Sequence, residues 1–90
     1  MTRGASSPGD RLAETCLDAM LQRQAWISAD LRIGLEDAAW FAGYSLGSFR
    51  NLLTEGKGPA TYRLGGGGHK RTIRIRDLAE WIESRRDEVI

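Results

Sequence analysis

Residue types that build many common functional sites are scarce in this sequence. The chain has one cysteine and one histidine, Cys16 and His69. These exclude an internal disulfide and are too few for the usual zinc site, so we expect no metal and no cofactor. No apolar run approaches the roughly 20 residues that span a bilayer. The first residues hold no apolar segment that would direct secretion, so we expect a cytoplasmic protein without a membrane partner.

Acidic residues are absent between Glu55 and Asp77, and this absence is the strongest functional signal. The 21 residues of this stretch hold six basic ones, namely Lys57, Arg63, Lys70, Arg71, Arg74 and Arg76. Because the whole chain has a formal net charge of only +1, the positive charge is a local concentration. It favours binding to a polyanion such as nucleic acid. The alternative is a solvated strand edge whose charges prevent aggregation.

The centre of the acid-free stretch predicts a β-hairpin. Residues 62–64 and 72–75 alternate between apolar and polar types, and four glycines lie between the two runs. The period of two predicts one apolar face and one face of arginines; the apolar set is Tyr62, Leu64, Ile73 and Ile75. We expect the hairpin to contact nucleic acid through Arg63, Gly66, Gly67, His69, Lys70, Arg71 and Arg74.

The glycine run does not fit a nucleotide-binding loop. His69 precedes Lys70 where a P-loop needs glycine, and a strand-like segment follows where it needs a helix. No nucleophile or orienting carboxylate accompanies His69 in the sequence pattern, so it does not indicate a catalytic base. Cys16 lies on an apolar helix face, where we expect a packed core residue. The sequence therefore predicts a binding protein and no enzyme.

Two short helices are predicted before the hairpin. The first has its apolar face at Leu35, Ala38, Ala39 and Ala42 and ends at Gly43. Ser45 is a favourable N-cap for the second, which buries Leu46, Phe49, Leu52 and Leu53 and ends at Gly56. This is a helix-turn-helix arrangement. Its second helix would present its first turns to DNA, through Ser45, Leu46, Gly47, Ser48, Arg50 and Asn51. The alternative interpretation is that these residues are only the polar surface of an amphipathic helix.

The N-terminal part predicts an amphipathic helix over about residues 10–27. Its apolar stripe needs a surface to cover, either in the same chain or in a neighbouring copy. The residues expected to support self-association are Leu12, Leu17, Met20, Leu21 and Trp26. Leu31 and Ile33 suggest a short strand, and a last helix is expected from about Asp77. Trp40 and Trp81 are expected to be core anchors.

Taken in order along residues 31–86, these elements resemble the excisionase or AlpA-type group, which has a MerR-like winged-helix fold. The likeness is carried by Ala38-Ala39, Gly43-Tyr44-Ser45, Leu52-Leu53, Gly58-Pro59, the basic stretch from Arg63 to Arg76, and Asp77-Leu78 with Trp81. We therefore expect a mainly α protein with a small β-hairpin. It would be a winged helix-turn-helix DNA-binding domain over residues 31–90, preceded by an N-terminal arm over residues 1–30 that carries the added helix.

The resemblance implies a bacterial or phage-encoded accessory protein of a mobile genetic element. Such proteins bind double-stranded DNA beside attachment sites, bend it, and steer a tyrosine recombinase (integrase) toward excision. Because one small module buries little surface on DNA, we expect cooperative self-association on neighbouring sites. Two alternatives stay open. Close relatives act as small transcriptional regulators, and the basic hairpin would also suit a protein-interaction module with an acidic partner.

Overall fold

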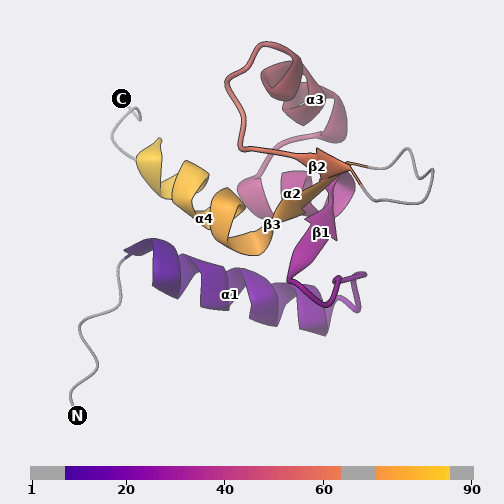
Figure 1. The fold of residues 1–90 in the computed structure, drawn as a ribbon, viewed down its shortest axis with the longest axis vertical. Helices are drawn as coiled ribbons and strands as arrows, with labels where there is room; N and C mark the ends of the chain where they lie inside the picture. Colours follow the sequence, from indigo (N-terminus) through magenta and orange to yellow (C-terminus); the bar gives the residue numbers. More distant parts are fainter. Residues whose placement is uncertain (1–7, 64–70, 86–90) are drawn as a thin grey trace.

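The computed structural model describes residues 8–63 and 71–85, which form a mainly helical protein with a small antiparallel sheet (Figure 1). None of the helices in this part of the chain is long and apolar enough to cross a membrane. The elements are α1 (Pro8–Gln22), β1 (Arg32–Gly34), α2 (Leu35–Ala42), α3 (Leu46–Thr54), β2 (Tyr62–Arg63), β3 (Arg71–Arg74) and α4 (Ile75–Ser84).

The sheet joins segments that are far apart in the sequence. Its strand order is β1-β3-β2, and both pairs are antiparallel. Ile33 of β1 lies opposite Ile73 of β3, and both side chains are fully buried. The short strand expected around Leu31 and Ile33 is thus confirmed, and it becomes an edge of the sheet.

The strand register corrects the predicted faces of the hairpin. Tyr62 lies opposite Thr72, so these two residues share a face, and Ile73 points to the other face. Ile75 is not in the strand, because α4 begins there, two residues earlier than expected. Leu64 lies outside the described residues. The prediction that Tyr62, Ile73 and Ile75 share one apolar face is therefore wrong.

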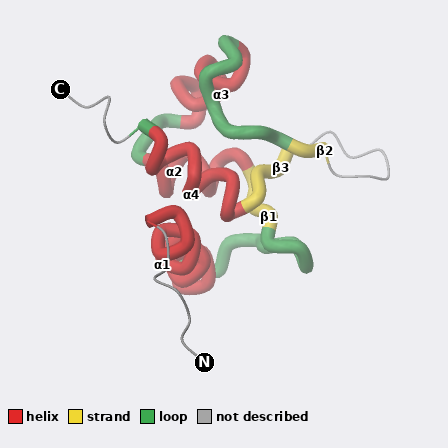
Figure 2. Tube along the Cα trace, turned by 60° about the vertical axis from the view of Figure 1, so that its left-hand side comes forward, coloured by secondary structure: helices red, strands yellow, loops and turns green. Residues whose placement is uncertain are grey.

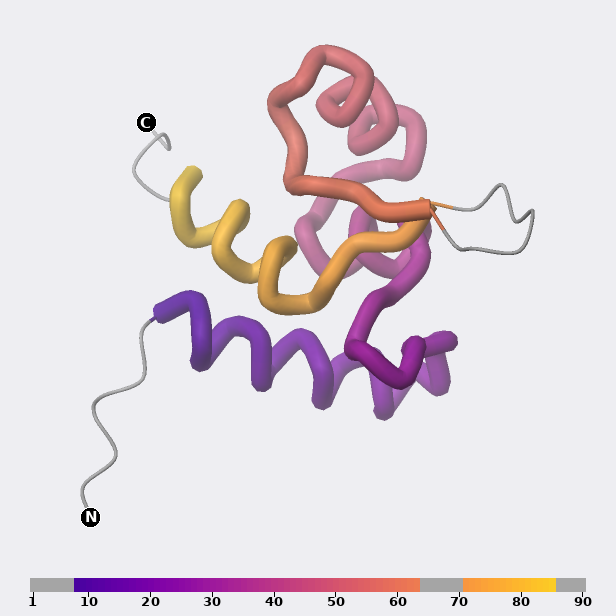
Figure 3. Tube along the Cα trace, viewed as in Figure 1, coloured from indigo at the N-terminus to yellow at the C-terminus, as the bar shows by residue number. Residues whose placement is uncertain are grey.

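Helix α1 is shorter than its apolar pattern predicted. It ends at Gln22, and Gln24 takes a left-handed conformation with φ of 56°. The Ala25 amide then donates to the carbonyl of Met20 over 2.9 Å, a hydrogen bond that closes the helix end. Ile27, expected in the helix, instead forms a bridge to Ile33 of β1. The chain therefore turns back toward the sheet after α1 (Figure 3).

Helix α1 covers its apolar stripe with the same chain. It runs along α4 in Figure 1 and lies next to it in the turned view of Figure 2. Cys16 and Met20 are fully buried in one core with residues of every other helix and of the sheet, namely Ile33, Ala38, Ala39, Phe49, Ile73, Ile75 and Leu78. Burial raises the pKa of the Cys16 thiol to about 12. The expected core position of Cys16 is confirmed.

This packing also bears on the residues expected to support self-association. Met20 has 0% of its surface exposed, so its side chain cannot contact a second copy, and its assignment to such a surface was wrong. Leu17 is partly buried against the core, and Leu12 is half-buried. Leu21, by contrast, is 59% exposed.

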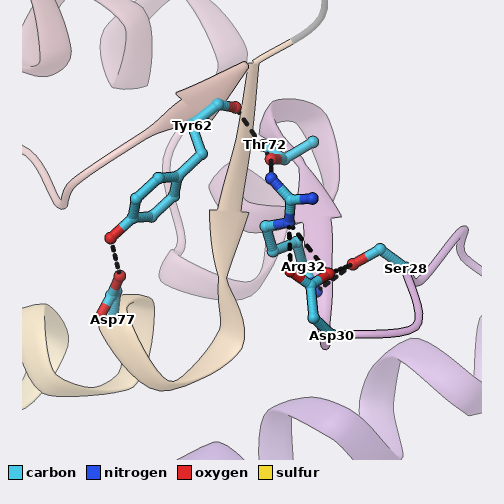
Figure 4. A network of polar contacts seen from close by, with 6 residues as sticks. All are labelled: Ser28, Asp30, Arg32, Tyr62, Thr72 and Asp77. Atoms are coloured by element: carbon cyan, nitrogen blue, oxygen red, sulfur yellow. Dashed lines mark hydrogen bonds and ion pairs between the residues drawn. The ribbon is translucent and has the colours of Figure 1, made fainter. Parts of the chain in front are cut away.

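A network of polar side chains connects the strands on the outer face of the sheet (Figure 4). The Arg32 guanidinium contacts Asp30 at 3.0 Å and donates to the Thr72 hydroxyl at 3.5 Å. Thr72 in turn donates to the Tyr62 carbonyl at 2.9 Å, and the Tyr62 hydroxyl donates to Asp77 at 3.0 Å. Hydrogen bonds from Ser28 and then from Arg32 lower the pKa of Asp30. The network ties β1, β2 and the start of α4 to β3.

The shared core predicts a large difference between two adjacent residues of α1. Met20→Ala should lower the free energy of unfolding by about 2 to 5 kcal/mol, because it leaves a cavity in the core. Leu21→Ala, at an exposed position, should change it by no more than about 0.5 kcal/mol. Urea-induced unfolding measures both. Equal effects of the two substitutions would show that α1 is not part of the core.

Candidate nucleic-acid interface

Helices α2 and α3 are joined by a tight turn whose ends match the sequence signals. Gly43 closes α2 with φ of 87°, in the left-handed region that glycine adopts without strain. The Tyr44 amide donates to the Ala39 carbonyl over 2.9 Å. Ser45 caps α3, because its hydroxyl oxygen accepts from the Ser48 amide at 3.1 Å. The predicted end of α2 at Gly43 and the predicted cap of α3 are confirmed.

An aromatic cluster fixes the orientation of α3. Phe49 is fully buried and packs edge-on to Trp81 of α4, with ring centroids 5.9 Å apart. Tyr44 contacts both rings, at 6.2 Å from Phe49 and 6.0 Å from Trp81. The Trp81 indole also donates to the Lys57 carbonyl over 2.8 Å. Trp81 is therefore an anchor as expected. Trp40 is not, because half of its surface is exposed.

With Phe49 turned inward, the opposite side of α3 faces outward. Of the residues predicted there to contact DNA, Leu46 is partly buried. The others are exposed, namely Ser45, Gly47, Ser48, Arg50 and Asn51. Arg50 forms no ion pair with any residue that the structure describes. The Ser45 hydroxyl already serves as the helix cap, so it has a structural role as well.

The arginines of the hairpin do not share one face, which corrects the expectation that they lie together. Arg63 and Arg71 are directly opposite each other on β2 and β3. Like charges in such a pair repel each other, and no acid within residues 8–63 and 71–85 forms an ion pair with either. Arg74 lies on the opposite face, with its guanidinium 4.9 Å from the centre of the Tyr62 ring. Four of the predicted hairpin contacts lie outside the described residues: Gly66, Gly67, His69 and Lys70.

Arg76 is also removed from the basic cluster. Its guanidinium lies 2.6 Å from Asp10 of α1 and 3.7 Å from Glu80. The hydrogen bond and charge of Asp10 raise the pKa of Arg76. The positive charge of Arg76 is thus compensated within the protein, although its place in the acid-free stretch suggested otherwise.

A groove of about 750 Å³ connects α3 with the sheet. Arg50 of α3 and Arg71 of β3 both line it. The other lining residues come from the loop after α1, the end of β1, the start of α2, α3 and β3: they are Trp26, Gly34, Leu35, Glu36, Asp37, Leu46, Leu53, Thr54 and Thr72. Two cationic side chains from separate elements therefore border one groove of mixed polar and apolar lining, where an anionic chain with apolar parts would find both kinds of contact.

Several groove residues were not identified from the sequence. Trp26 was assigned to self-association, because the helix pattern was extended through it. Glu36 and Asp37 carried no functional signal, since acids are ordinary in the first turn of a helix. Asp37 is paired with Arg23 at 3.1 Å, whereas Glu36 forms no ion pair with the described residues. Glu36 is therefore the acid in the groove whose charge is not compensated there.

Comparison of the chain with protein families, with curated proteins and with solved structures found no match.

The cap of α3 provides a stability test at the proposed interface. Ser45→Ala removes the acceptor of the Ser48 amide and should lower the free energy of unfolding by about 1 kcal/mol. Ser48→Ala changes a neighbouring exposed serine without removing that bond, and should have an effect within about 0.5 kcal/mol. Thermal or urea unfolding measures both. A Ser48 substitution as costly as the Ser45 substitution would contradict the capping role.

Proposed function

We propose that this protein is a winged helix-turn-helix that binds double-stranded DNA. Helix α3 would lie in the major groove, and the hairpin of β2 and β3 would follow the adjacent minor groove. The observation that carries the proposal is that Arg50 of α3 and Arg71 of β3 line the same groove. Neither has an ion-pair partner in the described part of the chain.

Electrostatics and geometry support this assignment together. A sugar-phosphate strand that separates a major from a minor groove would pass between the helix in one and the hairpin in the other. Arg50 and Arg71 would then approach phosphates from either side, and Arg63 lies opposite Arg71 to add a third positive charge. Asn51, exposed on α3, has the amide that pairs well with an adenine edge.

The biological role follows from the resemblance of residues 31–86 to excisionases. We propose an accessory protein that binds beside attachment sites, bends DNA and directs a tyrosine recombinase toward excision. The exposed Leu21 is the residue of the expected set that is best placed for contacts between copies on DNA. A small transcriptional regulator would use the same interface, and the position of its sites relative to a promoter or to an integrase gene distinguishes the two roles.

An acidic protein partner is the alternative for the same arginines, and the apolar groove residues Leu35, Leu46 and Leu53 favour it. Duplex binding measured by gel shift on DNA from the protein's own element separates the two functions. If Arg50, Arg63, Lys70 and Arg71 each neutralise one phosphate, the slope of log affinity against log salt should be roughly −4. Absence of duplex binding at low salt would reject the DNA proposal.

The arginines of the groove can be compared with a matched arginine outside it. Arg50→Ala and Arg71→Ala should each weaken duplex binding and reduce the steepness of the salt dependence by about 1, because each removes one phosphate contact. Arg76→Ala changes the same charge at a position already neutralised by Asp10 and Glu80, and should leave the slope unchanged. Fluorescence anisotropy over a salt series measures all three. Equal effects of the three substitutions would indicate only a general charge effect.

The uncompensated acid in the groove leads to a prediction of the opposite sign. Glu36→Gln should tighten duplex binding by about threefold, because it removes repulsion between this carboxylate and the phosphates. Glu14→Gln, which makes the same charge change on the exposed side of α1, is the control and should have a smaller effect. Binding that weakens when Glu36 is neutralised would contradict the placement of DNA along this groove.

A further inference from the structure

The loop after α1 holds an aromatic side chain in a defined position. On one side of Trp26, the Ala25 amide is hydrogen-bonded to the Met20 carbonyl at 2.9 Å. On the other side, Ile27 forms a bridge to Ile33 of the sheet. Because both neighbours are fixed by backbone contacts, the Trp26 backbone is held in place without a ligand. The side chain is nevertheless 50% exposed.

Exposure alone does not distinguish this residue, since Trp40 is equally exposed at 51%. Their surroundings differ. The Arg23 guanidinium lies 4.1 Å from the centre of the Trp40 ring and is itself held by Asp37, so one face of that ring is covered. Trp26 has no such cation or aromatic partner among the described residues. Half of the Trp26 surface is therefore open to a ligand, and its N–H donor has no hydrogen-bond partner within the described residues.

Trp26 also differs from Trp40 in where it lies. It lines the groove that Arg50 and Arg71 border, and Trp40 does not. We infer that Trp26 is a further DNA contact, so that the segment before residue 31 extends the interface. The indole face would pack on a deoxyribose, and its N–H would donate to a phosphate oxygen. This inference rests on the proposed DNA-binding function.

The charges of the groove favour an anionic ligand for Trp26, and duplex DNA is such a ligand. The two arginines that line the groove and Arg63, opposite Arg71, have no acidic partner in the described chain. Of the two acids in the groove, Asp37 is already paired with Arg23, so Glu36 is the one acid unpaired within the described residues, against two arginines in the lining. A ligand with negative charges as well as apolar surface therefore matches this lining, and a sugar-phosphate chain supplies both at short, regular intervals. The contact would be independent of base sequence, because deoxyribose and phosphate are the same at every step.

Substitutions of the two exposed tryptophans test the inference. With a mixed-sequence duplex at low salt, Trp26→Ala should weaken binding roughly tenfold, because it removes an aromatic packing contact and a hydrogen bond to a phosphate. Trp26→Phe keeps a ring and should recover part of the affinity, whereas Trp40→Ala should bind like the unmodified chain. The salt slope should not change in any of these variants, because no charge is removed. Thermal unfolding of each variant confirms that the fold is intact.

Intrinsic fluorescence gives a second readout that does not depend on affinity. Saturating duplex should quench the emission of the Trp40→Phe variant, in which Trp26 remains, and should quench the Trp26→Phe variant much less.

The inference is overturned if Trp26→Ala binds duplex as tightly as Trp40→Ala while Arg50→Ala and Arg71→Ala still weaken binding. That result would leave the DNA function standing and assign Trp26 to a protein contact. Failure of the unmodified chain to bind duplex would instead overturn both proposals.

Discussion

The pairing of β1 with β3 is the constraint on which the rest of the structure depends. It joins Ile33 to Ile73 across forty residues of sequence, and the Ile75 amide extends it by donating to the Leu31 carbonyl at 2.9 Å. Helices α2 and α3 and strand β2 lie between the paired segments, while α4 begins directly after β3. The same few hydrogen bonds therefore set where α3 stands relative to the hairpin. A separate bridge between Ile27 and Ile33 brings the loop after α1 to the same part of the sheet.

The register of this small sheet also distributes the charge of the chain. It directs Arg71 to the groove beside α3 and Arg74 to the outer face, where it stacks over Tyr62. A shift by one residue would exchange these faces. The network that ends at Asp77 opposes such a shift, because Tyr62 and Thr72 are each held by a side-chain bond to another element. A chain with a net charge of only +1 thereby places uncompensated arginines on two sides of one groove.

Features that depend on local signals were predictable from the sequence. The left-handed Gly43 and the capping Ser45 mark the turn between α2 and α3, and both are seen in the structure. Features that depend on tertiary contacts were not. The apolar pattern of α1 continues past Gln22, but pairing of Ile27 with the sheet ends the helix earlier. Of the two acids that pair with Arg76, Asp10 is the closer in space and lies 66 positions away in the sequence, so only the weaker contact with Glu80 had a local sign.

The central claim is that duplex DNA occupies the groove between α3 and β3. Amide and indole NMR shifts recorded while the full chain is titrated with duplex DNA test it most directly, because they report every element at once. The account predicts that the largest changes fall on α3 from Leu46 to Asn51, on Arg63 and Arg71, and on the Trp26 indole, while the face where α1 meets α4 stays unchanged. Changes confined to α1 and α4, or a titration without changes in α3, would contradict it.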